Sequence, residues 1–310
     1  MIDGYTDNEE LIGDYNNQLF LKRKLNIERM NYLKAFKGYK SLYAISRSNN
    51  YFDMDFFLEK LNLAKLLISS TFKTFKLIPF ERYLVYFKEN NDLGGFYDSK
   101  AGGFHYITLV GFSTLLNNQR INCSKLIAIE LLRNYIHDCF HFSTYRSFKV
   151  TSKGNDGKEF YRYQYGFNFR NEFGISYSDS RLTSISPKAI NLNLLMEGVT
   201  AIYTSNVMSS LSCEKDFILL NPINFQIYND IINLKITDFK ILDNLPLQFY
   251  NEILLPCKIF IEHWGGCPFI YTCINAMLKG DFNLIKNYFD YKSGEKNYID
   301  KHFKQKKFNF

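Results

Sequence analysis

Apolar side chains recur at helical spacing through the first ninety residues of the chain. From about 53 to 72 they follow one another every three or four positions, and Phe57 and Leu61 lie on one wide apolar stripe. Mixed spacings of three and four also run among charged residues from about 8 to 36. We therefore predict that residues 1–90 form a helical lobe.

The pattern changes at residues 90–95, where asparagine, aspartate and glycine predominate and predict a turn. The segment 104–110 that follows is rich in β-branched and aromatic residues, which is typical of a strand. Farther along, the first half of residues 150–186 alternates aromatic and polar side chains. This alternation predicts a β-hairpin or an extended insertion.

Two further amphipathic stretches predict helices in the middle of the chain, one from about 124 to 142 and one from about 193 to 208. The remainder, from about 213 to 310, is mostly helical by the same criterion. The residues that open or end its helices are Pro246, Gly265, Gly266, Pro268, Gly280 and Asp281.

Together these patterns predict an α+β fold that is mainly helical, with a small sheet and flanking helical lobes. We expect an N-terminal lobe at 1–90, a core at 91–212 and a C-terminal lobe at 213–310. Because no proline- or glycine-rich linker separates them, we expect one compact unit. With 46% apolar residues among 310, the chain can bury a substantial core, which excludes a disordered protein.

The net charge changes this picture little. A formal charge of +7, with short basic clusters at 22–24 and 304–307, is mild for this length, and no recognition motif accompanies it. We interpret these residues as solvated faces and expect no nucleic-acid partner. A basic helical adaptor for nucleic acid or membrane is kept as the third functional hypothesis.

The cysteines and the N-terminal segment bear on the compartment. None of the six cysteines forms a CxxC pair or a small-domain disulfide framework, so we expect reduced or buried thiols. Residues 1–7 lack the basic and apolar regions of a signal peptide, and no apolar run approaches the roughly 18 residues of a membrane span. We therefore expect a cytoplasmic protein, or one secreted into a host cell without a cleaved signal peptide.

The segment with the clearest chemistry lies within the predicted helix at 124–142. It contains His137 and His141, four residues apart on a strongly helical background. This spacing brings both imidazoles to one face of the helix, so that both can reach one metal ion. The alternative is a pair of half-buried helix histidines whose polar atoms are satisfied by neighbours.

A catalytic zinc ion usually has three protein ligands, so two histidines leave one position to be filled. Glu197, on the predicted helix at 193–208, is the candidate, since a carboxylate neutralises part of the charge of the ion. It follows Leu194, Leu195 and Met196, and in such an apolar setting a buried carboxylate needs a metal, a cation or hydrogen-bond donors.

These residues resemble the motifs of the gluzincin zinc metallopeptidases, which carry His-Glu-x-x-His on one helix and a glutamate ligand on a later one, often as Glu-Gly-x-Thr. The matching segments are His137-Asp138-Cys139-Phe140-His141 and Glu197-Gly198-Val199-Thr200. Upstream, Gly94-Gly95-Phe96-Tyr97-Asp98 and the strand at 104–110 look like the edge strand that such enzymes place above the active helix. The resemblance covers about 94–205, a little over a third of the chain.

The resemblance implies a zincin-like core that binds Zn²⁺ through His137, His141 and Glu197 and acts as a metalloendopeptidase on a protein or peptide substrate. Zinc would activate a water molecule, Asp138 would take its proton, and the substrate would add to the strand at 104–110 by main-chain hydrogen bonds. The candidates for the group that steadies the oxyanion are Tyr203, Tyr145 and His263.

One position departs from the family pattern. The general base of gluzincins is a glutamate, whereas Asp138 is shorter by one methylene, which sets its carboxylate back by about 1.5 Å. Misplacement on this scale can cost on the order of a hundredfold in rate. The sequence therefore supports two leading functions. One is a zinc metallopeptidase, such as a secreted effector or toxin, and the other is a catalytically silent zincin-like scaffold that binds a protein partner.

Overall fold

The computed structural model describes most of the chain in separate segments. They are residues 8–35, 40–48, 52–86, 95–97, 105–108, 124–152, 157–169, 192–211 and 255–302. Within them the fold is α+β and mainly helical, as predicted, with its strands in two small sheets. Residues 90–94 of the predicted turn, the second half of the 150–186 segment and the predicted helix start at Pro246 lie outside the described residues.

One sheet contacts helix α5 (Ser124–Ser143) and has the strand order β2-β3-β5-β4. Its strands are β2 (Lys40–Ser41), β3 (Tyr83–Tyr86), β4 (Gly95–Tyr97) and β5 (His105–Thr108). β3 and β5 run parallel, whereas β2 pairs antiparallel with β3, and β4 with β5. The contact with α5 is made by Tyr83, whose ring lies edge-on to that of Tyr135 with centroids 4.9 Å apart.

The predicted strand at 104–110 is present as β5, but it is not the edge of this sheet. β5 pairs with β3 on one side and with β4 on the other, and within the described segments β4 pairs with β5 alone. Gly95, the last residue of the predicted turn at 90–95, begins β4, which is extended because its backbone pairs with β5. β4 therefore provides the edge that we expected of the strand at 104–110.

The other sheet joins the beginning of the described chain to its middle. In spatial order its strands are β1 (Glu9–Ile12), β6 (Arg146–Ser152), β7 (Lys158–Tyr165) and β8 (Asn168–Phe169). β6 and β7 form the predicted hairpin. β1 corrects the helix expected from about residue 8, because parallel pairing with β6 holds it extended, and α1 (Tyr15–Ala35) begins only after Gly13.

Where the structure describes them, the predicted starts and stops of the C-terminal helices are confirmed. Pro268 lies in the first turn of α10 (Cys267–Lys279), Gly280 ends that helix in the left-handed conformation, and Asp281 caps α11 (Phe282–Ser293). Among the described helices, none combines the length and the apolar character that a bilayer span requires. The other described helices are α2 (Leu42–Ser48), α3 (Met54–Thr71), α6 (Asn193–Leu211), α9 (Leu255–His263) and α12 (Tyr298–His302).

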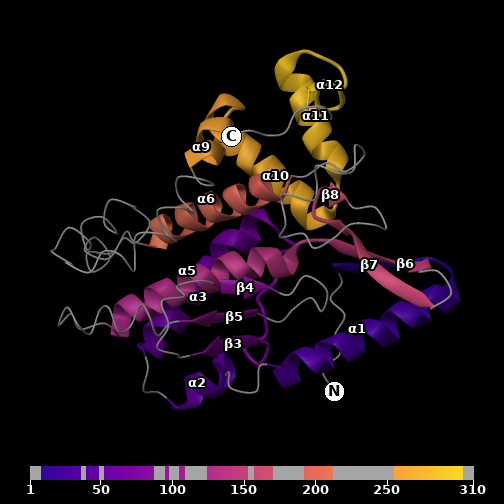
Figure 1. Cartoon of the computed structure of the whole chain (residues 1–310). Helices are drawn as coiled ribbons and strands as arrows, with labels where there is room; N and C mark the ends of the chain where they lie inside the picture. Colours follow the sequence, from indigo (N-terminus) through magenta and orange to yellow (C-terminus); the bar gives the residue numbers. More distant parts are fainter. Residues whose placement is uncertain are drawn as a thin grey trace, which may run out of the picture.

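Helix α5 is packed into a shared hydrophobic core. It contacts α3 and α6, and α6 in turn contacts α9 and α10 (Figure 1). One cluster of buried side chains contains residues from the predicted regions 1–90, 91–212 and 213–310. The side chains that α5 and α6 present to each other are therefore held in place by packing from all three regions.

Candidate metal centre

The last two turns of α5 carry the two histidines of the site. The apolar stripe of this helix fixes its rotation, because Leu132, Ile136 and Phe140 are completely buried. His137 and His141, one turn apart, then project from the same side. Their Nε2 atoms lie 3.0 Å apart.

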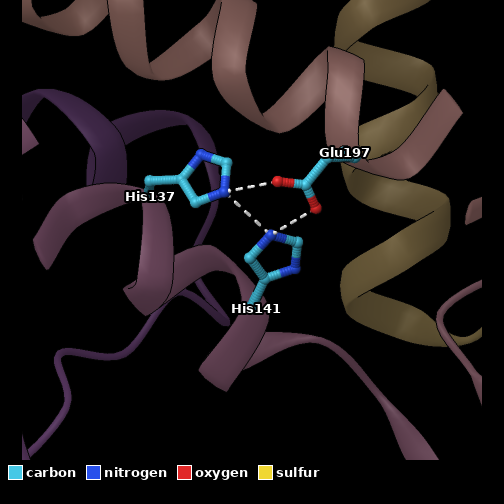
Figure 2. A group of neighbouring side chains, drawn as sticks. All are labelled: His137, His141 and Glu197. Carbon is cyan, nitrogen blue, oxygen red and sulfur yellow. Dashed lines mark hydrogen bonds and ion pairs between the residues drawn. The ribbon is translucent and has the colours of Figure 1, made fainter. Parts of the chain in front are cut away.

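Glu197 reaches this pair from the neighbouring helix α6. Its Oε1 lies 2.9 Å from Nε2 of His137, and its Oε2 lies 3.1 Å from Nε2 of His141 (Figure 2). One potential ligand atom from each of the three residues lies within 4.8 Å of the others. The structure thus brings together the three side chains that the sequence predicts as ligands, and this triad could hold a metal ion.

The donor set of the triad suits a divalent cation. Two imidazole nitrogens and a carboxylate converge on one region, and two nitrogens at 3.0 Å repel each other unless a proton or a cation lies between them. The side chains of His137, His141 and Glu197 are 16%, 11% and 33% exposed. The imidazoles are therefore largely withdrawn from solvent, while the carboxylate is partly exposed.

The charges of the triad act strongly on one another. Burial alone would raise the pKa of Glu197, but the two histidines hold it well below its usual range, so the carboxylate is ionised. Burial lowers the pKa of His137, and the attraction of Glu197 only partly offsets this. For His141 the attraction and hydrogen bond of Glu197 outweigh burial, so its pKa is raised. The triad therefore combines the ionised carboxylate of Glu197 with two imidazole nitrogens that could serve as metal ligands.

The glycine after Glu197 has a packing role. Gly198 is buried, and a Cβ placed there would overlap Sγ and Cβ of Cys257 on α9. Only a residue without a side chain lets α9 approach α6 this closely, directly beside Glu197. Burial raises the pKa of Cys257 to about 12, and the charge of Glu197 adds to this, so Cys257 stays a neutral thiol.

Asp138, predicted as the general base, is buried on the side of α5 that faces the sheet. Its Oδ2 accepts a hydrogen bond of 3.1 Å from the hydroxyl of Tyr83 on β3. Burial raises the pKa of Asp138 to about 7, although the positive charge of His141 and the bond from Tyr83 oppose the rise. Asp138 is therefore electrostatically coupled to the triad, and its role as a base stays a prediction.

Tyr83 and Tyr165 are two phenols at this site that the sequence did not single out. The hydroxyl of Tyr165 on β7 lies 3.0 Å from Nδ1 of His141. In the sequence Tyr165 is one of several aromatic residues in an alternating strand, and nothing distinguishes it from Tyr161 or Tyr163. Its part in the site depends on how β7 packs against the end of α5, which no local pattern encodes.

Tyr203, predicted as a catalytic residue, lies in an aromatic cluster. Its ring is edge-on to Phe72 at 5.2 Å and to Phe140 at 5.4 Å, and it also contacts Tyr271. Within the described residues no hydrogen bond joins its hydroxyl to the triad. Burial raises its pKa to about 12, as expected of a phenol in the core. The structure thus gives Tyr203 a packing role, and its catalytic role stays a prediction.

The other two oxyanion candidates are also placed elsewhere. The hydroxyl of Tyr145 donates a hydrogen bond to Glu10 on β1. His263 is exposed at the end of α9, with its ring against that of Trp264. Neither residue is hydrogen-bonded to the triad within the part of the chain that the structure describes.

Comparison of the chain with protein-family models, with curated proteins and with solved structures found no match. What can be said of its function therefore comes from the triad and the side chains around it.

Proposed function

We propose that this chain is a zinc-dependent metallopeptidase that hydrolyses a peptide bond in a protein substrate. The observation that carries the proposal is the triad of His137, His141 and Glu197, whose ligand atoms lie within 4.8 Å of one another on two packed helices. Gluzincins, which the sequence resembles, use this combination of ligands. A pair of ordinary helix histidines would not require an ionised, partly buried carboxylate opposite both rings.

Zinc is the ion that best suits these donors. Zinc accepts imidazole nitrogen and carboxylate oxygen at about 2.0–2.2 Å, and its catalytic sites use three protein ligands with one position left open. Ions that prefer all-oxygen ligands, such as magnesium and calcium, suit two imidazoles poorly. When bound, zinc would polarise the scissile carbonyl and make a water molecule more acidic.

Asp138 is the side chain of this site that would hold and return the proton. Its pKa of about 7 means that both its charged and its neutral form are populated near neutral pH, which general acid–base catalysis requires. The bond from Tyr83 fixes one of its carboxylate oxygens. We propose that Tyr83 holds Asp138 in a constant orientation while the proton is transferred.

The substrate would bind as an extended segment along β4 and not along β5. β5 has partners on both sides, whereas β4 is paired on one side within the described segments. Tyr97 of β4, His105 of β5 and Tyr83 of β3 occupy one row across the sheet. Because Tyr83 contacts Asp138, this row connects the edge strand to the site. Main-chain hydrogen bonds to such an edge bind a peptide with little dependence on its sequence.

Metal content is the first test. Elemental analysis of the purified chain is expected to give about one zinc per chain. His137→Ala, His141→Ala and Glu197→Ala are each expected to lose it while keeping the helical circular dichroism of the wild type. His263→Ala, which removes an exposed histidine outside the triad, is the matched control and should retain the metal. Wild-type protein that holds no zinc after incubation with the ion would overturn the proposal.

A second function, a zinc-binding scaffold without turnover, is favoured by one observation. Asp138 is shorter than glutamate, and part of its carboxylate is engaged by Tyr83. Incubation of zinc-loaded protein with a peptide library separates the two functions. Cleavage by the wild type that is lost in Asp138→Asn indicates a peptidase. If one zinc is bound and no peptide is cleaved, the scaffold is the better description.

A further inference from the structure

The hydroxyl of Tyr165 contacts one ligand of the triad at two points. It lies 3.0 Å from Nδ1 of His141 and 3.3 Å from the main-chain carbonyl oxygen of the same residue. The Tyr165 side chain is buried, and its ring is stacked with the imidazole of His141 at an interplanar angle of 20°. The guanidinium of Arg162 lies over the Tyr165 ring, 4.4 Å from its centre. Such a phenol has little freedom to move away from His141.

The chemistry of an imidazole ligand explains what this contact can do. A metal ion needs the lone pair of Nε2, so the proton of neutral His141 must then be on Nδ1. The oxygen of Tyr165 can accept that N–H, and its own O–H can donate to the carbonyl of His141. The three groups close a small ring of hydrogen bonds that leaves Nε2 as an acceptor facing Glu197.

Tyr165 also suits the metal-free site. There Nε2 of His141 lies 3.1 Å from Glu197 and can donate its proton to the carboxylate. Nδ1 is then an acceptor, and the hydroxyl of Tyr165 turns to donate to it. A hydroxyl can play both parts, whereas a carboxylate or a carbonyl oxygen can only accept.

The backbone of His141 is held independently of Tyr165. Arg146, which is fully buried, donates to the carbonyl of His141 at 3.2 Å and also to the carbonyl of Phe142. Removal of the Tyr165 hydroxyl therefore leaves the end of α5 in place. It affects the tautomer and the orientation of the imidazole.

We infer that Tyr165 is a positioning residue of the metal centre, which aims Nε2 of His141 and, by accepting the Nδ1 proton, supports the tautomer that binds the ion. This inference rests on the metal binding in the proposed function. Groups that orient a metal-bound histidine in this way typically contribute a factor of about 10 to 100 in metal affinity.

The test compares Tyr165→Phe with Tyr163→Phe, which lies on the same strand and whose ring contacts Phe169 and Lys149. Each substitution removes only one hydroxyl. Competition with a chromophoric chelator at neutral pH measures the zinc affinity, and thermal unfolding of the metal-free proteins measures their stability. We expect Tyr165→Phe to bind zinc about 10 to 100 times more weakly at nearly unchanged stability, and Tyr163→Phe to match the wild type. Equal zinc affinities of Tyr165→Phe and wild type would overturn the inference.

A second measurement does not depend on zinc. The ring ¹⁵N resonances of His141 in the metal-free protein report which nitrogen carries the proton and its hydrogen bonds. They should shift in Tyr165→Phe and stay in place in Tyr163→Phe, and unchanged resonances in both variants would overturn the contact itself. A wild type that binds no zinc would overturn the proposed function, while the ¹⁵N shifts would still decide whether Tyr165 directs His141.

Discussion

His137 and His141 lie one helical turn apart and Glu197 comes from another helix, yet the three side chains share one small volume and their protonation states depend on one another. Glu197 raises the pKa of His141 above the usual histidine value of 6.5. This shift bears directly on metal binding, because a protonated imidazole cannot bind an ion. Protons therefore compete with the metal at a higher pH than they would for an isolated histidine.

This competition predicts the pH dependence of zinc binding. Zinc affinity should be nearly constant at alkaline pH and fall as the pH decreases through the raised pKa of His141, with the loss beginning above 6.5. Calorimetric titrations between about pH 8.5 and about pH 5.5 measure this. An affinity that stays constant until the pH is well below 6.5 would contradict the coupling between His141 and Glu197.

Asp138 predicts a second pH effect, on the stability of the metal-free protein. Its pKa is about 7 in the folded chain against 3.8 ordinarily, so the folded state binds the proton more tightly than the unfolded state. The contribution of Asp138 to the free energy of unfolding is therefore greatest below its ordinary pKa and decreases as the pH rises from 3.8 to about 7. Above that range the buried charge is a net cost.

Asp138→Asn should consequently be more stable than the wild type at pH 8, by on the order of a few kcal/mol at most. The gain should shrink at about pH 5, where the folded wild type is already protonated. Urea unfolding of both metal-free proteins at the two pH values gives the difference. A gain that is the same at both pH values would show that the carboxyl is not titrating in this range.

The sequence predicted the three side chains that the structure brings together, but not the residues that contact them. His137 and His141 were recognisable because the helical repeat brings positions four apart to one face, and Glu197 because a carboxylate among apolar residues needs a partner. Tyr83 lies 55 residues from Asp138, and Tyr165 lies 24 residues from His141. Such contacts depend on how strands pack against a helix, so they cannot be predicted from composition or from the periodicity of apolar residues.

At the scale of elements, the contact between α6 and α9 determines where Glu197 sits. Gly198→Ala would place a methyl group against the buried Cys257, and α9 would have to move. We expect a loss of about 1–3 kcal/mol in the free energy of unfolding, together with weaker zinc binding.

The double variant Gly198→Ala, Cys257→Ala supplies the control for this prediction. Removal of the sulfur makes room for the new methyl group, so the double variant should recover part of the stability that the single variant loses. Urea unfolding of the wild type, both single variants and the double variant completes the cycle. Strictly additive effects would show that Gly198 and Cys257 do not contact each other as described.

The end of α5 depends on a second element, strand β1. Arg146 of β6 donates to the carbonyls of His141 and Phe142, and its Nη1 lies 3.8 Å from Oε1 of Glu9 on β1. The side chains of both charged residues are at most 1% exposed. A buried charge that loses its partner is strongly destabilising.

Arg146→Met should therefore reduce the free energy of unfolding by about 3–5 kcal/mol, because Glu9 loses its cation and the carbonyls of α5 lose their donor. Thermal or urea unfolding measures the loss. Lys158→Met, which removes an exposed cation from the neighbouring strand, should change stability by no more than about 0.5 kcal/mol. Similar effects of the two substitutions would contradict a special role for Arg146.

Elements were predictable where their information is local. The helices α3, α5, α6, α10 and α11 follow from apolar periodicity and from capping residues such as Asp281. β1 and β4 did not follow, because each is four residues long or shorter and is extended only through pairing with a strand elsewhere in the chain. A short segment in such a position has no periodicity of its own to reveal it.

At the scale of the whole molecule, the two helices that carry the triad share one main core with α3, α9, α10 and α11, while α1 packs on the β1-β6-β7 sheet in a smaller cluster. An ion that binds both helices should therefore stabilise the main core as one unit. We expect one cooperative thermal transition that moves to higher temperature with zinc, equivalent to about 2.7 kcal/mol at a hundredfold excess over Kd. Glu197→Ala should show the transition without the shift. Two separate transitions, only one of which responds to zinc, would contradict the shared core.

The pairing of β1 with β6 also has a consequence in time. Asn8, directly before β1, donates a buried hydrogen bond to the carbonyl of Ser143 at the end of α5, 135 residues later. During synthesis at about 5–20 residues per second, the partner of β1 is therefore made on the order of ten seconds after β1 itself. Contacts of such long range slow folding, since the loop between them must close first. The end of α5 that carries His141 is thus completed late, and a nascent chain should assemble the triad in its final geometry only after β1 has paired with β6.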